Sequence, residues 1–386
     1  MQTQTKTKKF KLKYVINYLL IGVFFLCFLT LDMTGGLRSS TTQLLTKIGY
    51  SIVLAVSLNL VVGFLGELSL GHAGFMCIGA YIGCFCGNYL NGVLPSKLLV
   101  IIIAMLIGGI SAAICGCLIG IPTLRLKGDY LAIATLAFGE IVRTIFKNQE
   151  IFGGALGLTT TRYGKSLYII GFVLALFVVF VSQNLMRSKH GRAIQAIRDN
   201  EIAARAMGVN VTYYKLMVFI LSAFFAGTAG VIYGNSVTPV SNTFFSFNYS
   251  IEILVMVVLG GMGNITGSII AATLLTFINV QLTTQLSGDM AALRYLIYAL
   301  ILIAMVIWNN APALAGVRDR LNFRRLAEFL QKKFLRKKEE EGGTEPPTNA
   351  AWDKIPTKIP MDAILSTDVI PDHSQEPDKP EKGDSK

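Results

Sequence analysis

Gly191-Arg-Ala-Ile-Gln-Ala-Ile-Arg-Asp-Asn-Glu-Ile-Ala-Ala-Arg-Ala-Met-Gly208 is a polar, helix-forming stretch that lies between two long apolar runs, residues 166–186 and 213–234. A helix that crosses a membrane needs about 20 predominantly apolar residues, so both runs are long enough to span. The sequence therefore predicts two membrane helices joined by a loop that contains one ordered, polar helix.

Helical spacing gathers the apolar side chains of this stretch on one side of the predicted helix: Ala193, Ile194, Ile197, Ala204 and Met207. Gly208 follows the pattern, as a glycine that ends a helix does. A short amphipathic helix of this kind suits docking into a groove of a soluble partner. It also suits a helix that lies on the membrane surface, and the spacing alone does not decide between the two.

The composition is that of an integral membrane protein. Of the 386 residues, 53% are hydrophobic and 15% are charged, whereas soluble domains carry about 25% charged residues. The net charge of +12 comes from Lys and Arg that cluster beside apolar runs, as the orientation of membrane proteins requires. Membrane lipid is therefore the expected surrounding, and no nucleic-acid partner is expected.

An all-α, polytopic membrane protein with about eight to ten transmembrane helices is the predicted fold class. The candidate spans are residues 15–31, 47–65, 69–90, 97–121, 130–147, 166–186, 212–236, 250–261, 265–287 and 291–308. The segment 251–261 is short and the segment 66–79 is interrupted by glycine, so each is a candidate half-helix or re-entrant segment.

The basic residues predict the orientation and the domain boundaries. With a basic, cytoplasmic N-terminus at residues 1–14, most Lys and Arg outside the spans fall on the cytoplasmic side, and both termini are cytoplasmic. The transmembrane domain covers residues 15–310. Residues 317–338 are predicted to form a basic amphipathic segment at the cytoplasmic leaflet. Residues 339–386 are predicted to be a disordered tail, because they lack the apolar surface that folding requires.

Two glycine-rich stretches resemble the broken helices from which transporters build their pathways. One is Gly63-Phe-Leu-Gly66-Glu67-Leu-Ser-Leu-Gly71-His72-Ala-Gly74, and the other is Gly260-Gly-Met-Gly263-Asn-Ile-Thr-Gly267. The candidate residues for the translocation pathway or its gate are Gly63, Gly66, Glu67, His72, Gly260 and Gly263. Alternatively, the small residues only allow close helix packing, and the histidine is a hydrogen-bonded structural residue.

Signals of catalysis are absent from the sequence. The nearest approach to a phosphate-binding loop, residues 159–166, has threonine in place of the first glycine and no preceding strand. No catalytic residue, metal site or cofactor is predicted, so any ATP that drives this protein is used by another chain. Glu140 and Arg143 lie three residues apart within a predicted span and are expected to pair with each other, which favours a structural over a functional role for them.

Five blocks of sequence, in order, resemble the larger permease subunit (LivM type) of branched-chain amino acid ABC importers. The blocks are residues 59–81, 124–143, 191–208, 257–263 and 293–298, and the resemblance runs over about residues 45–317. It implies that residues 191–208 are a cytoplasmic coupling helix, with an EAA-x3-G motif that docks onto an ATPase. The coupling residues are then Arg192, Glu201, Ala203, Ala204 and Gly208, with Ile202 inserted after the motif's glutamate.

The same resemblance implies import of Leu, Ile and Val across the bacterial inner membrane. The implied partners are a second permease of the LivH type, two ABC ATPase subunits and an extracytoplasmic amino-acid-binding protein. The substrate alternative is urea or a short amide. From another class, an ion-coupled secondary transporter would use Glu67, His72 and residues 260–267, and a membrane scaffold would use the tail. Pro312-Ala-Leu-Ala-Gly316 replaces the family's Pro-x-Gly-Leu turn, and the tail has no counterpart in the family.

Overall fold

The computed structural model describes residues 21–22, 39–126, 128–161, 163, 166–285, 299–300 and 303. Within these residues every regular element is a helix, and one isolated bridge joins Leu158 to Val240. The predicted spans 15–31 and 291–308 lie outside the described residues except for a few positions. The predicted segments 1–14, 317–338 and 339–386 lie wholly outside them.

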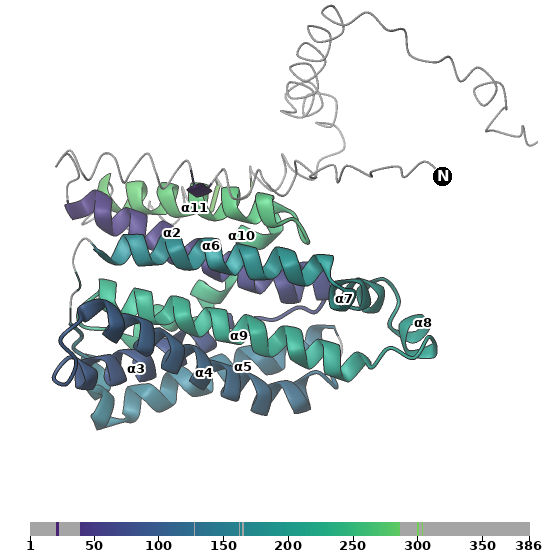
Figure 1. Ribbon diagram of the computed structural model, residues 1–386, viewed down its shortest axis with the longest axis horizontal. Helices are drawn as coiled ribbons and strands as arrows, with labels where there is room; N and C mark the ends of the chain where they lie inside the picture. The colour runs from purple at the N-terminus through teal and green to yellow at the C-terminus, as the bar shows by residue number, and fades with distance from the viewer. Residues whose placement is uncertain are drawn as a thin grey trace, which may run out of the picture. The chain divides into compact units, whose positions relative to one another are not determined.

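Six of the described helices are long and apolar enough to cross a membrane. They are α2 (Ser39–Asn59) with its π-helical continuation η1 (Leu60–Leu65), α3 (His72–Leu90), α4 (Lys97–Thr123), α6 (Ser166–Arg187), α9 (Val211–Ser236) and α11 (Ile265–Gln285). Figure 1 shows these helices side by side, with two short helices, α7 and α8, at one end of the bundle. The all-α polytopic fold predicted from the sequence is confirmed.

Two further helices of the described residues pack with these six. α5 (Asp129–Asn148) is as long as a span but carries four charged side chains, and α10 (Phe247–Gly260) has only 14 residues. Short 3-10 turns, η2 (Glu150–Phe152), η3 (Gly154–Leu156) and η4 (Asn242–Phe245), lie in the connections. The short segment noted in the sequence is therefore a short helix, which begins three residues before the candidate span 250–261.

Small residues set the spacing of the central helices. A Cβ atom on Gly79 of α3 would lie 2.1 Å from the Gly227 carbonyl oxygen of α9, and one on Gly230 would lie 2.1 Å from the Met76 carbonyl oxygen. Only glycine allows the backbones to approach so closely. In lipid the hydrophobic effect does not hold helices together, so they associate through such close van der Waals packing. α2 is buried along its length between α6, α9, α10 and α11.

Both α3 and α10 begin part-way along the bundle. His72, the first residue of α3, lies beside Ser57 of α2, with 2.8 Å between Nε2 and Oγ. The α2–η1 helix continues eight residues past Ser57, which is roughly 10 Å, so residues 66–71 return along the bundle without helical structure. The Ala73 amide donates to Ser250 Oγ at 3.1 Å, which places the start of α10 at the same level. The glycine-interrupted segment is thus a broken helix, which is one of the two alternatives that the sequence left open.

Candidate functional site

Residues 191–208 form two helices, not the single helix that the sequence predicts. α7 (Lys189–Asp199) and α8 (Glu201–Ala206) are separated by Asn200, whose backbone is extended with φ −158° and ψ 103°. The Asn200 side chain accepts a hydrogen bond from the Ala203 amide at 3.0 Å and so caps α8. Because an asparagine in this conformation starts a new helix, the predicted continuous helix is wrong.

The break changes which apolar side chains share a face. Ile194 and Ile197 of α7 and Ala204 of α8 are buried, in agreement with the predicted apolar side. Met207 is 84% exposed, so it does not join them, because the helical phase restarts at the break. Ile202 is also 79% exposed. The short helix α8 and the residue that follows it therefore present two large apolar side chains to the outside.

Gly208 ends α8 as the sequence predicts. Its φ is +82°, in the left-handed region that favours glycine. The Val209 amide donates to the Ala204 carbonyl at 3.1 Å, and the Gly208 amide donates to the Arg205 carbonyl at 3.0 Å. This pair of hydrogen bonds is a Schellman cap, which satisfies carbonyls that the helix end leaves free.

Arg198, near the end of α7, joins this helix to the first glycine-rich stretch. Its Nη1 donates to the Gly63 carbonyl oxygen at 3.0 Å, and its Nε and Nη2 face Asp199 Oδ1 at 3.4 and 3.3 Å. The aliphatic part of the side chain lies against Gly66, where a Cβ atom would be 2.7 Å from Arg198 Cγ. Gly66 also has φ +83°, so both its backbone and its neighbour require glycine.

The second glycine-rich stretch meets the first at the same place. The Gly263 amide, in the turn between α10 and α11, donates to Asn59 Oδ1 at 2.9 Å, and Asn59 Nδ2 donates to Ser268 Oγ at 3.0 Å. A Cβ atom on Gly63 would lie 2.2 Å from the Gly263 nitrogen. The two glycine-rich stretches therefore pack against each other at the place that Arg198 of α7 contacts.

An ion-pair chain makes a second link between the short helices and the bundle. Lys215 of α9 donates to Glu67 Oε1, and its Nζ lies 3.2 Å from Glu201 Oε2 at the start of α8. Glu201 also accepts from Arg205 Nη2 at 2.8 Å. The Lys215 side chain is only 4% exposed, so its charge depends on these carboxylates for compensation. Glu67 is thus tied to α8 through a buried cation.

His72 occupies a separate, buried position. Its ring contacts Ser57 Oγ, and the Ser57 carbonyl accepts from Ser222 Oγ at 2.7 Å, so the histidine belongs to a hydrogen-bonded contact between α2, α3 and α9. This arrangement matches the structural alternative considered for it. Gly260 likewise has a packing role, since a Cβ atom there would lie 2.5 Å from the Gly267 carbonyl carbon.

The structure therefore gathers part of the predicted site. Arg198 contacts Gly63 and Gly66, and Lys215 contacts Glu67. Gly263 lies beside them, because it packs against Gly63. Arg192 and Ala203 face outward on α7 and α8. We name the set of contacts made by Arg198, Lys215, Glu67 and Glu201 the α7–α8 junction.

The sequence analysis missed Arg198, Lys215 and Asn59 as site residues. A usable signal existed for Lys215, which lies inside the predicted span 212–236. A lysine within a span needs a partner, and Glu67 was already a candidate in a glycine-rich break. For Arg198 and Asn59 no sequence pattern points to contacts with residues more than 130 positions away.

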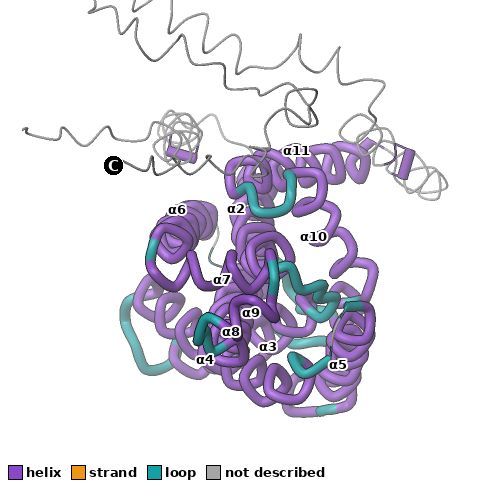
Figure 2. The backbone as a smooth tube through the Cα atoms, turned by 90° about the vertical axis from the view of Figure 1, so that its right-hand side faces the viewer, coloured by secondary structure: helices purple, strands orange, loops and turns teal. Residues whose placement is uncertain are grey.

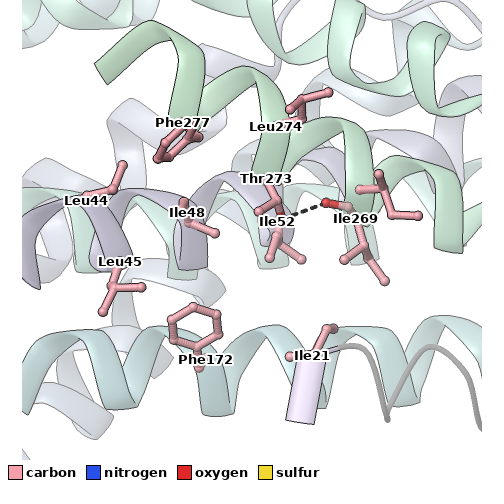
Figure 3. A pocket seen from close by; sticks show the side chains of 11 residues that line it. Ile21, Leu44, Leu45, Ile48, Ile52, Phe172, Ile269, Thr273, Leu274 and Phe277 are labelled. Carbon is pink, nitrogen blue, oxygen red and sulfur yellow. Dashed lines mark hydrogen bonds between the residues drawn. The ribbon is translucent and has the colours of Figure 1, made fainter. Parts of the chain in front are cut away.

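A pocket of about 390 Å³ lies elsewhere in the bundle, between α2, α6 and α11 (Figure 3). Its lining is aliphatic and aromatic apart from Thr273, whose hydroxyl donates to the Ile269 carbonyl at 2.8 Å. The pocket offers no charged group to a polar ligand. It is therefore distinct in place and chemistry from the α7–α8 junction.

Comparison with known proteins identifies the family. The family model described as "Branched-chain amino acid transport system / permease component" matches residues 40–306. The chain is 34% identical to the high-affinity branched-chain amino acid transport system permease protein LivM of Escherichia coli, over 74% of this chain and 72% of the relative. It is also 34% identical to LivM of Salmonella typhimurium, over 71% and 69%.

A more distant relative is the LivH permease protein of the same transport system in Salmonella typhimurium, which is 24% identical over 69% of this chain and 89% of the relative. No solved structure matches the chain. The family model covers most of the spans and both glycine-rich stretches, and it ends before the predicted tail. The chain belongs to the family of permease components of branched-chain amino acid transport systems.

Proposed function

We propose that this chain is the membrane permease subunit of an ABC importer that moves branched-chain amino acids, Leu, Ile and Val, across the bacterial inner membrane. In this proposal the chain itself is not an enzyme, and separate ATPase subunits hydrolyse ATP. Membership of the permease family and the names of the LivM relatives support the substrate class. The geometry of the α7–α8 junction supports the coupling role.

The outward side of α7 and α8 would dock onto an ATPase subunit. Arg192 and Ala203 are exposed there, and Ile202 of α8 and Met207, which follows α8, expose most of their apolar surface. An amphipathic helical segment that offers apolar anchors suits a groove on a soluble partner.

The inward side of the same helices would pass motion to the bundle. The observation that carries the proposal is the hydrogen bond from Arg198 to the Gly63 carbonyl, because it joins α7 to the place where a broken membrane helix meets the turn before α11. Glu201 and Lys215 add a second connection, to Glu67. ATP would drive transport by binding more tightly to one arrangement of these contacts than to the other.

The remaining assignments follow from this role. The proposed partners are a second permease of the LivH type, two ATPase subunits and an extracytoplasmic amino-acid-binding protein. Both termini would be cytoplasmic, with residues 1–14, 317–338 and 339–386 as cytoplasmic segments that flank the transmembrane domain, residues 15–310. No cofactor is needed in the permease.

Reconstitution of the purified complex in proteoliposomes tests the function. We expect leucine uptake that requires ATP, persists with an ionophore that collapses ion gradients, and is not inhibited by urea. Uptake by this chain alone, abolished by the ionophore, would instead indicate the ion-coupled alternative. Inhibition by urea or a short amide would indicate the other substrate class.

Docking is tested with a matched pair of variants. Ile202→Glu places a charge on the exposed apolar surface of α8, and we expect it to remove the ATPase subunits from the purified complex. Ile151→Glu alters a residue of similar exposure, 69%, in a connection remote from α8 in the sequence, and should leave the complex intact. Equal retention of the ATPase in both variants would contradict the docking surface.

A further inference from the structure

Two sides of the bundle differ in what they expose. In Figure 2, α4 and α6 lie on one side of the bundle and α5 and α10 on the other. Lys97 at the start of α4, and Asn184 and Arg187 in the last turn of α6, are exposed. Between these ends, the exposed large side chains of the two helices are apolar: Leu98, Leu99, Ile102, Leu106, Ile110, Ile114, Leu118, Ile121, Val173, Phe177 and Phe180. Such continuous apolar stripes are what lipid tails require of a membrane helix.

The opposite side also exposes apolar side chains, among them Ile133, Ile141 and Ile145 of α5, but it adds polar and charged groups in the middle of a helix. On α5, the side chains of Glu140 and Arg143 are 37% and 32% exposed and pair with 3.2 Å between Oε2 and Nε, and Thr144 is exposed next to them. On α10, Asn248 is exposed. The α5–α10 face is defined here by these four residues.

These groups lie at membrane depth. Glu140 is the twelfth residue of the 20-residue helix α5, so at about 1.5 Å per residue it is roughly 16 Å from the start of the helix and roughly 12 Å from its end. The adjacent Gly139 packs on Gly74, near the start of α3, which itself begins part-way along the bundle. Arg or Asp at the centre of a lipid-facing helix costs roughly 3 kcal/mol. This face is therefore unsuited to lipid.

A second element fixes the carboxylate. Glu140 Oε1 accepts a hydrogen bond from the Phe247 amide at 3.1 Å, so the pair lies where α10 starts inside the bundle. The pair is thus held by backbone on one side and exposed on the other. A purely structural ion pair would be expected to lie between helices, as Lys215 and Glu67 do.

We propose that the α5–α10 face lines the aqueous translocation pathway, and that Glu140 and Arg143 bind the ammonium and carboxylate of a zwitterionic substrate. The proposal rests on the function proposed above and deepens it by naming the binding residues. A guanidinium binds a carboxylate through two parallel N–H donors, and a carboxylate binds an ammonium, so an adjacent pair of opposite charges suits an amino acid. The apolar pocket of Figure 3 lacks such groups and is not this site.

Thiol labelling of the complete importer in proteoliposomes tests the lining. In a background in which all six cysteines are replaced by alanine, Thr144→Cys and Asn248→Cys introduce single thiols on the α5–α10 face. Ile110→Cys and Phe177→Cys introduce matched thiols on the apolar side, where the native side chains are 51% and 52% exposed. We expect a membrane-impermeant, charged methanethiosulfonate reagent to modify the first pair at least tenfold faster than the second.

Leucine tests the binding residues in the same preparation. We expect saturating leucine to slow modification of Thr144→Cys several-fold, and Glu140→Gln or Arg143→Gln to raise the leucine concentration that protects by about tenfold. Equal reactivity of the four thiols would overturn the pathway lining. Rapid modification that leucine does not slow, in a complex that still takes up leucine, would overturn the zwitterion site alone. Absence of leucine uptake, measured separately, would count against the proposed function instead.

Discussion

Lys215 is the most buried charged side chain of the α7–α8 junction, so its removal has a calculable effect. In Lys215→Met the side chain keeps its length and loses its charge, which leaves the Glu67 carboxylate, 14% exposed, without a cation. Removing one partner of a buried pair costs about 3–5 kcal/mol. Because Glu67 and Glu201 are partly exposed and Glu201 retains Arg205, we expect the lower end, about 3 kcal/mol.

The double variant Lys215→Met/Glu67→Gln removes the stranded charge as well. We expect it to be more stable than Lys215→Met by about 2 kcal/mol, because no uncompensated carboxylate remains. The exposed Lys147 offers a matched control on α5. Lys147→Met should change the free energy of unfolding by less than about 0.5 kcal/mol.

The chain contains its own reporters for this measurement. Cys77 and Cys84 are free and buried, so a thiol-reactive fluorophore reports thermal unfolding in detergent once the other four cysteines, Cys27, Cys86, Cys115 and Cys117, are replaced by alanine. For domains of 150–250 residues about 1 kcal/mol corresponds to roughly 2–4 °C, so Lys215→Met should lower the midpoint by about 6–12 °C. If the double variant unfolds at or below the midpoint of Lys215→Met, the buried ion-pair chain does not exist as described.

Three further predictions concern single positions. Gly66→Ala forces a Cβ into the left-handed region and against Arg198, so it should lower the unfolding midpoint and leucine uptake, whereas Gly92→Ala, which meets only a contact of 3.5 Å, should do neither. Asn200→Ala removes the α8 cap, worth about 1 kcal/mol, and should speed amide exchange at residues 201–206; unchanged exchange would contradict the cap. Ser57→Ala removes the partner of His72 and should destabilise the chain by about 1–2 kcal/mol while ATP-driven uptake persists; lost uptake in a stably folded variant would indicate a transport role for the histidine.

Most of the fold could be predicted because a membrane span is recognisable in the sequence as an apolar run of sufficient length. The helices α2, α3, α4, α6, α9 and α11 each coincide with a predicted span to within a few residues, apart from an earlier start of α2 at Ser39. Even the half-helix α10 was indicated by its short apolar run. Glycine at residues 63–74 indicated the break before α3 as one of two alternatives, the other being close helix packing.

The internal geometry of the site could be predicted less well. The helix break depends on the conformation of Asn200, and a single asparagine in a helical pattern is compatible with either outcome. Contacts such as Arg198 with Gly63 depend on how distant segments pack, which periodicity does not encode. The Glu140–Arg143 pair was predicted correctly, but its exposure was not, because helical spacing shows that two side chains can meet and not whether a third element covers them.

The coupling of ATP hydrolysis to uptake in an Arg198 variant tests the central claim most directly. In proteoliposomes that contain the complete importer, the account predicts that Arg198→Ala continues to hydrolyse ATP but takes up at least fivefold less leucine per ATP. The matched control Lys189→Ala, an exposed position at the start of α7, should keep the ratio of the unmodified complex. An unchanged ratio in a stably assembled Arg198→Ala complex would contradict the claim that this contact carries motion from α7 to the membrane helices.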